Sequence, residues 1–175
     1  MAKFQKPYPD GLQREHTVAG GYWRRHASPM ALLLLLALVL TGISGALGHE
    51  RDWTARAGGV ALDVHAPEVL RNGEILEMRV AVTADRPIGV LVIGLSDELW
   101  RDMTVNTMIP AASDERSRDG ELRFSYGPLE PGVRFLLKVD LQANPDIVLG
   151  TAGHITVYDG ERALVSTSMA ITVLP

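Results

Sequence analysis

Residues 76–84, LEMRVAVTA, decide the fold class, because every second side chain in them is apolar. The apolar positions are Leu76, Met78, Val80, Val82 and Ala84. The stretches 133–141 (VRFLLKVDL), 121–126 (ELRFSY) and 165–173 (VSTSMAITV) alternate in the same way. A period of two places one face of a segment on a core and the other in water, which is typical of a half-buried β-strand.

Weaker strands are predicted around these four, at 60–66, 88–95, 103–109 and 153–159. Turn pairs separate the segments: Asn72-Gly73, Asp119-Gly120, Pro131-Gly132 and Asp159-Gly160. Such pairs punctuate short strands, and no convincing amphipathic helix interrupts them. Seven or eight short strands within residues 60–175 therefore predict an all-β domain, an antiparallel β-sandwich, with a barrel as the main alternative.

Two segments resemble known modules. Leu129, Pro131 and Gly132 in LEPGVRFLLKV (129–139) match the corner before the F strand of fibronectin type III domains. Phe135 stands where those domains carry the tyrosine of their corner, so that hydroxyl is missing. RNGEILEMRVAV (71–82) resembles the turn and B strand of bacterial Ig-like modules. The resemblance implies an Ig-like β-sandwich of the kind found in bacterial membrane-anchored proteins.

Before this domain lies an apolar run, PMALLLLLALVLTGISGALG (29–48), with no charged side chain from 30 to 48. About 20 apolar residues suffice for a transmembrane helix, and Ser28 with Pro29 fits the start of one. The run length and the long segment before it favour a retained signal-anchor. The small-x-small triplet at 46–48 favours the alternative, cleavage after Gly48 and release of the domain.

Flanking residues predict the orientation. Arg24 and Arg25 precede the run, which places the N-terminus in the cytoplasm of a bacterial inner membrane and the C-terminal domain in the periplasm or outside the cell. Trp23 and Trp53 are candidate membrane-flanking residues at the inner and outer interfaces. Residues 1–28 are expected to form a largely disordered basic head, and 49–59 a linker.

Composition excludes several classes of function. The chain has no cysteine, and its formal charge is −4. The acidic residues outnumber the basic ones after residue 48, which argues against nucleic-acid binding. Without a phosphate loop, a metalloprotease motif or a nucleophile elbow, the sequence predicts neither an enzyme nor a bound cofactor.

The leading functional prediction is a protein-interaction module. Its expected partners are another membrane or envelope protein and the lipid bilayer. The connection after residue 95 concentrates large apolar side chains. These candidate contact residues are Leu99, Trp100, Met103, Met108 and Ile109. The alternative interpretation is that Trp100 closes the end of the core.

A metal site is a further alternative, for a released ligand-binding domain. Asp63 and His65 point outward from one predicted strand and His154 from another. If the two strands were neighbours, two histidines and a carboxylate would suit zinc or copper.

Overall fold

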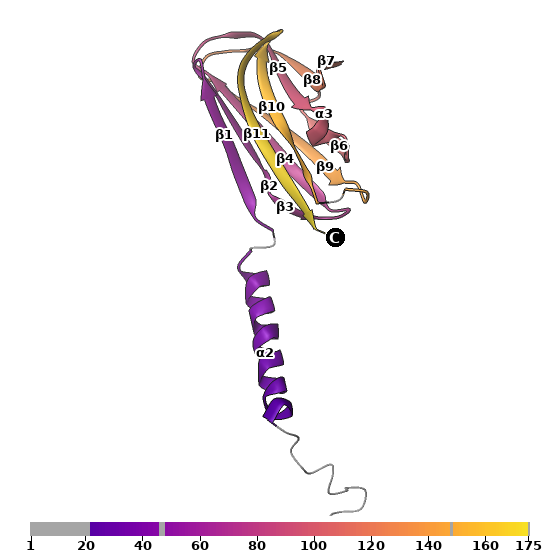
Figure 1. Ribbon diagram of the computed structural model, residues 1–175. Helices are drawn as coiled ribbons and strands as arrows, with labels where there is room; N and C mark the ends of the chain where they lie inside the picture. The colour runs from indigo at the N-terminus through magenta and orange to yellow at the C-terminus, as the bar shows by residue number, and fades with distance from the viewer. Residues whose placement is uncertain (1–21, 46–47, 148, 175) are drawn as a thin grey trace, which may run out of the picture. The chain divides into compact units, whose positions relative to one another are not determined.

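The computed structural model describes residues 22–45, 48–147 and 149–174 and divides the chain into two units, 1–46 and 47–175 (Figure 1). The described part of the first unit contains the helix α2 (Tyr22–Ile43). Most of the predicted head, residues 1–21, lies outside the described residues.

Helix α2 begins earlier and ends earlier than the sequence predicts. Pro29 lies inside it, so Ser28 does not cap it and residues 22–28 are helical rather than part of a disordered head. Arginine and alanine favour helix, and the helix continues upstream of Pro29 although a proline inside a helix removes one backbone hydrogen bond and crowds the preceding turn. Among the described residues, no helix combines the length and the apolarity that a membrane crossing requires.

The second unit is built from strands. The described residues form β1 (Glu50–Ala57), β2 (Val60–Pro67), β3 (Val69–Arg71), β4 (Ile75–Ala84), β5 (Ile88–Ser96), the short helix α3 (Asp97–Trp100), β6 (Met103–Ile109), β7 (Asp114–Arg118), β8 (Glu121–Leu129), β9 (Arg134–Ala143), β10 (Thr151–Asp159) and β11 (Arg162–Leu174).

These strands form two sheets, which confirms the predicted β-sandwich (Figure 1). The five-stranded sheet has the order β1-β2-β4-β9-β6, and the six-stranded sheet has the order β3-β11-β10-β5-β8-β7. All neighbours are antiparallel except β3 and β11. The core lies between the sheets, where the alternating residues of β4 and β9 meet those of β5, β10 and β11. Leu62, Val80, Ile93, Leu137 and Ile155 are fully buried there, and each contributes about 1.5–3 kcal/mol.

Three strands were not predicted. β1 occupies most of the expected linker 49–59, and β3 and β7 are also new. β1 buries only Trp53, and all five residues of β7 are exposed, so neither shows the alternation of a half-buried strand. Both are edge strands whose backbones pair with β2 and β8, and this pairing leaves no pattern in the side chains.

The resemblance to an F strand is wrong for residues 129–139. The turn at Gly132, where φ is 74°, leads into β9, which pairs with β4 and β6. In Ig-like folds the F strand lies in the sheet opposite the B strand, but β9 lies directly beside β4, the strand matched to B. A Pro-Gly turn determines the local reversal of the chain and carries no information about which sheet the next strand joins.

Candidate functional site

The predicted contact segment is mostly buried. Leu99, Trp100 and Met103 are 2%, 8% and 7% exposed and belong to the core. The rings of Trp100 and Phe124 lie 6.2 Å apart between centroids. The structure therefore supports the alternative interpretation, in which Trp100 closes the core, because the single turn α3 directs its apolar side chains between the sheets.

The other two contact candidates lie on β6. Met108 is partly buried, and its sulfur accepts a hydrogen bond from the hydroxyl of Tyr126 at 3.2 Å. Ile109 is 55% exposed. The five predicted residues thus form no continuous surface.

Of the membrane-flanking residues, Trp53 is placed in the core. It lies in β1, is 9% exposed and packs with the buried cluster, while the guanidinium of Arg51 lies 5.6 Å from its ring centroid. Trp53 is therefore not available at a membrane interface. Trp23, Arg24 and Arg25 lie in α2, and their side chains are outside the described residues.

The candidate metal site is not formed. Asp63 and His65 lie on β2 in the five-stranded sheet, whereas His154 lies on β10 in the six-stranded sheet. The sequence correctly predicted that all three alternate with core residues, but the two strands belong to different layers. Within the described residues, no group of three histidines or carboxylates is arranged to hold a metal ion.

The outward face of the five-stranded sheet is the first candidate site, and we call it the outer face. The register aligns Asp52, His65, Arg79 and Lys138 in one row across β1, β2, β4 and β9, and Thr54, Asp63, Ala81 and Leu136 in the next. A shallow hollow of about 580 Å³ lies over these rows. Its lining residues are Asp52, Asp63, His65, Arg79, Ala81, Arg134 and Leu136. Small Ala81 beside long neighbours produces the depression.

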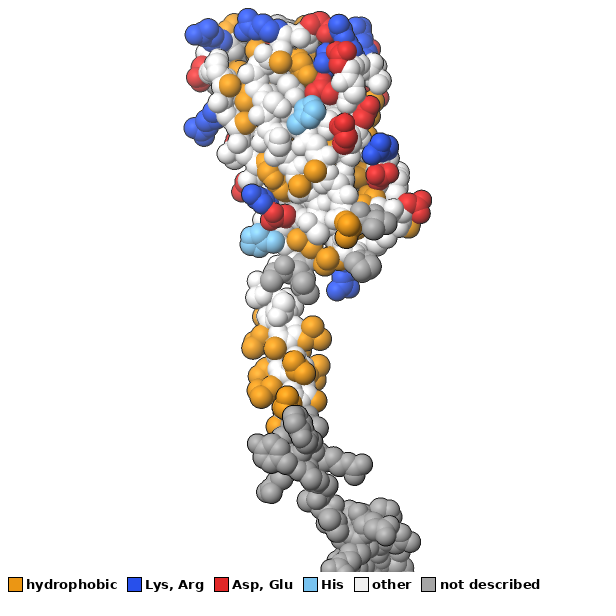
Figure 2. All heavy atoms as spheres, viewed as in Figure 1, with side chains coloured by type: hydrophobic (Ala, Val, Ile, Leu, Met, Phe, Trp, Pro, Cys, Tyr) orange, Lys and Arg blue, Asp and Glu red, His pale blue; other side chains and the backbone are white. Residues whose placement is uncertain are grey.

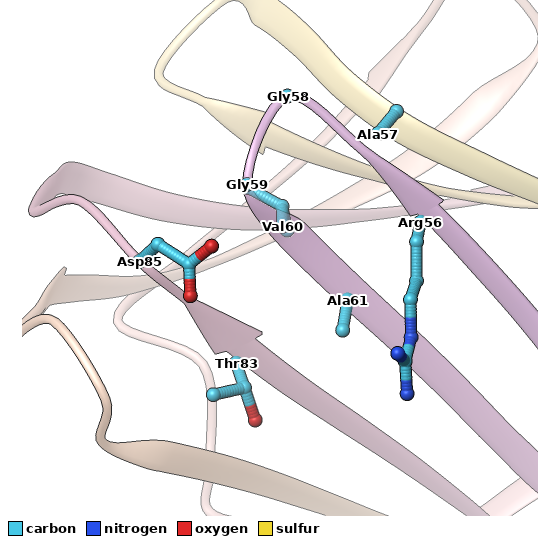
Figure 3. A pocket seen from close by; sticks show the side chains of 8 residues that line it. All are labelled: Arg56, Ala57, Gly58, Gly59, Val60, Ala61, Thr83 and Asp85. Atoms are coloured by element: carbon cyan, nitrogen blue, oxygen red, sulfur yellow. The ribbon is translucent and has the colours of Figure 1, made fainter.

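A second hollow, of about 370 Å³, continues along the same face toward the turn between β1 and β2 (Figure 3). Arg56, Ala61, Thr83 and Asp85 line it, and the next pair along the register is Asp63 and Ala81. The two hollows therefore follow each other along β2 and β4. The turn is tight because Gly58 and Gly59 adopt φ of 59° and 82°, which glycine tolerates.

Charges of both signs lie side by side on the outer face. Asp52, Asp63 and Arg56 lie on β1 and β2, and Arg79, Arg134 and Lys138 lie on β4 and β9. Arg79 pairs with Glu77 of its own strand at 2.5 Å. Lys138 and Glu77 form an ion pair at 2.6 Å, and the hydrogen bond between them lowers the pKa of Glu77 and raises that of Lys138. Among the described residues, Asp63 and Arg134 make no ion pair or side-chain hydrogen bond.

His65 lies between two carboxylates at the edge of this face. Its Nδ1 is 2.7 Å from Asp52 and its Nε2 is 3.0 Å from Glu50. The hydrogen bond to Asp52 raises the pKa of His65 above its ordinary value; desolvation opposes this, and Glu50 adds to it. These contacts favour the protonated ring and anchor β1 to β2.

The outward face of the six-stranded sheet contains a buried carboxylate, Glu121, which is 4% exposed. It accepts hydrogen bonds from Tyr158 at 2.5 Å and from Arg123 at 3.0 Å, and His154 lies 3.1 Å away. Burial acts to raise the pKa of Glu121, but these partners outweigh it and lower the pKa below its ordinary value. Gly94 makes room for the cluster, since a Cβ there would lie 2.9 Å from both Glu121 and Tyr158.

No pattern in the sequence predicts this cluster. Alternation correctly placed Glu121 and Arg123 outward on β8, but only the neighbouring strands reveal what covers them. A carboxylate with a lowered pKa is a weak base. The arrangement is suited to holding β5, β8 and β10 together.

A cleft of about 350 Å³ adjoins the cluster. Arg116, Arg118, Arg123 and Glu161 are among its lining residues. Each arginine is already paired: Arg116 with Asp114 at 2.7 Å, and Arg118 and Arg123 with Glu161 at 2.6 and 3.3 Å. The internal ion pairs leave the cleft without free positive charge for an anionic ligand, so the outer face is the stronger candidate.

Comparisons with known proteins do not assign a family. No family model matches the sequence, and no curated protein matches it. The matching solved structures include CaCohA2 from Clostridium acetobutylicum, with 17% identity, a TM-score of 0.45, and coverage of 67% of this chain and 92% of that one. A non-cellulosomal cohesin from Archaeoglobus fulgidus has 12% identity, a TM-score of 0.39, and coverage of 61% and 86%. A chitin-binding domain of a Pyrococcus furiosus chitinase has 14% identity, a TM-score of 0.34, and coverage of 66% and 96%. Similarity at this level carries no argument about function.

Proposed function

We propose that the sandwich is a protein-interaction module that binds its partner through the outer face of the five-stranded sheet. The observation that carries this is that Asp63 and Arg134, which have no ion pair or side-chain hydrogen bond among the described residues, line the same hollow as Leu136, which is 49% exposed. Charged groups that pair with nothing inside the chain keep their full capacity to pair with another protein. An exposed leucine at the centre supplies the apolar contact that such interfaces need.

The partner's chemistry follows from the two charged side chains that have no ion pair among the described residues. A complementary surface presents a basic side chain toward Asp63 and an acidic side chain toward Arg134. A carbohydrate is less well suited, because sugar rings stack on aromatic faces. The large exposed apolar side chains among the described residues are aliphatic or methionine.

Membrane attachment is the second part of the proposal, and it rests on the sequence, since no described helix meets the requirement for a span. Residues 29–48 would hold the domain at a bacterial inner membrane, with the N-terminus in the cytoplasm. The large apolar side chains of α2 from Met30 to Ile43 are exposed, and their nearly consecutive positions place them on all sides of the helix instead of in one stripe. Figure 2 shows those on one side. A helix that is apolar all round needs lipid or protein around it.

The third part of the proposal is that the sandwich has an Ig-like architecture. The order β2-β4-β9-β6 corresponds to the A-B-E-D sheet, and β11-β10-β5-β8 to the G-F-C-C′ sheet. The order of the strands along the chain differs from that of Ig-like domains. The strand that corresponds to D, β6, precedes the strand that corresponds to C′, β8, instead of following it, and β7 also precedes β8. This correspondence supports an Ig-like architecture.

Two experiments test the proposal. The binding face is tested by affinity purification of the full chain from mild-detergent extracts, with Leu136→Asp as the test variant. Val90→Asp is the matched control, because Val90 is 44% exposed but lies in the six-stranded sheet. We expect a specific protein to be recovered with the wild type and the control and lost with Leu136→Asp. Equal recovery with both variants, or recovery of the chain alone in several detergents, would overturn the binding face.

The anchor is tested separately by sequencing the N-terminus of the mature protein. Retention of residues before 29 is the expected result. A new terminus at His49 would establish the alternative, a domain released by cleavage after Gly48.

A further inference from the structure

Among the described residues, the two sheets have four edge strands, and the side chains of one edge differ from those of the other three. β1 and β6 are the edges of the five-stranded sheet, and β3 and β7 are the edges of the six-stranded sheet. Each edge presents unpaired backbone N–H and C=O groups to any extended chain. Natural sheets discourage such pairing by keeping an edge strand short or by placing charges on it.

Three of the four edges carry these protections. β3 is only three residues long. In β7, DERSR, four of the five residues are charged. In β1, ERDWTARA, four of the eight are charged. Pairing along these edges would be short or would strip water from charged side chains.

β6 lacks both protections. Its seven residues, MTVNTMI, contain no charge. The four from Thr104 to Thr107 are all exposed, and Val105 and Ile109 are 38% and 55% exposed. Valine, isoleucine and threonine favour extended pairing. β6 has one other feature that discourages edge pairing, a register shift between Val105 and Thr107 where it pairs with β9, and the residues on either side of this shift keep their pairing with β9.

We propose that β6 pairs antiparallel with β6 of a second copy of this chain. When two copies of β6 pair, no charged side chain is buried, because neither strand carries a charge. Pairing of β6 with β1 or β7 of another copy would place it beside a strand with four charged residues. A β6–β6 pair is also isologous and closes on itself, while β6 with β1 or β7 is head-to-tail and leaves further edges open. Because the remaining edges are protected, assembly stops at two copies.

This arrangement has a consequence for binding. Antiparallel pairing within the sheet plane joins two five-stranded sheets into one, with the two-fold axis perpendicular to it. Both outer faces then point the same way and offer two identical contact surfaces, which favours a bivalent or dimeric partner through effective concentration. The dimer itself does not depend on the proposed function of that face.

Cysteine cross-linking tests the pairing, because the chain has no cysteine of its own. Asn106 lies at the centre of β6 and is exposed, so Asn106→Cys in two paired copies brings the thiols close to the two-fold axis. Thr54→Cys on β1 and Ser117→Cys on β7 are matched controls, since both are exposed positions on edge strands. The full chain is used in detergent, with a mild oxidant to form the disulfide.

We expect Asn106→Cys to form the covalent dimer on the order of 1,000-fold faster than either control, since pairing gives an effective concentration on the order of millimolar against micromolar protein. Adding Thr107→Lys to Asn106→Cys places a charge on the edge and should reduce the cross-linking rate to that of the controls. Adding Leu136→Asp should leave the rate unchanged. Equal rates at all three cysteines would overturn the proposal and would indicate association elsewhere, for example through the apolar helix. Loss of partner recovery with Leu136→Asp while the cross-link persists separates the two proposals.

Discussion

Replacing Trp100 by alanine should destabilise the sandwich strongly. Trp100 is 8% exposed and packs against Phe124, so truncation removes most of its contacts. An aromatic side chain buries about 150–250 Å², and losing about 150 Å² at about 25 cal/mol per Å² costs about 4 kcal/mol. A hollow of about 290 Å³ borders the ring beside Asp97 and Leu122. Water can therefore enter the vacated space, which favours the lower part of the usual range of about 3–5 kcal/mol.

Thermal unfolding followed by near-ultraviolet circular dichroism measures this loss, because that signal reports aromatic packing. For a domain of this size, about 3–4 kcal/mol corresponds to a fall in Tm of roughly 10–15 °C. Val105→Ala is the control, since Val105 is 38% exposed on β6 and should change Tm by about 2 °C or less. A Tm within about 3 °C of wild type for Trp100→Ala would refute the burial argument and restore Trp100 as a candidate contact residue.

Three further predictions concern the polar clusters. Gly94→Ala should cost about 1–3 kcal/mol in urea unfolding, because the new Cβ would lie 2.9 Å from Glu121 and Tyr158. The pKa of Glu121 is lowered, so its stabilising effect is present above the ordinary carboxyl pKa and is lost as the pH falls through the folded value. Glu121→Gln should therefore reduce the slope of the unfolding free energy against pH in the acidic range. An unchanged slope in that range would contradict this. The pKa of His65 is raised, so its contribution is present below the ordinary value of 6.5 and is lost as the pH rises through the folded pKa. His65→Gln should reduce the pH dependence of the unfolding free energy above pH 6.5. An unaltered slope against pH in that range would count against the contact with Asp52.

The alternation of apolar and polar residues predicted strands reliably where a strand has one buried face. Each of the eight segments predicted as strands forms a strand, and β4 buries the residues that the pattern identified. The Asp159-Gly160 turn also joins β10 to β11 as the sequence indicates. The method failed for β1, β3 and β7, because an edge strand is held by backbone pairing and needs no apolar side of its own.

The functional residues were less accessible to sequence reasoning. Large apolar side chains outside the regular alternation marked 99–109 as a contact surface, but a single helical turn is enough to direct Leu99 and Trp100 into the core. The outer face was not foreseen, although Asp63 and Leu136 belong to predicted strands. Its character depends on which residues lie opposite each other across four strands.

The sequence by itself determined the β class of the domain, the separate apolar helix before it and the direction in which most side chains of each strand point, because these follow from local periodicity and composition. Only the tertiary structure decided which strands share a sheet. That choice separated His154 from His65, enclosed Glu121 among Tyr158, Arg123 and His154, and left β6 as an uncharged edge. The physical reason is that sheet order is set by contacts between residues far apart in the chain, and such contacts leave no periodic trace in the sequence.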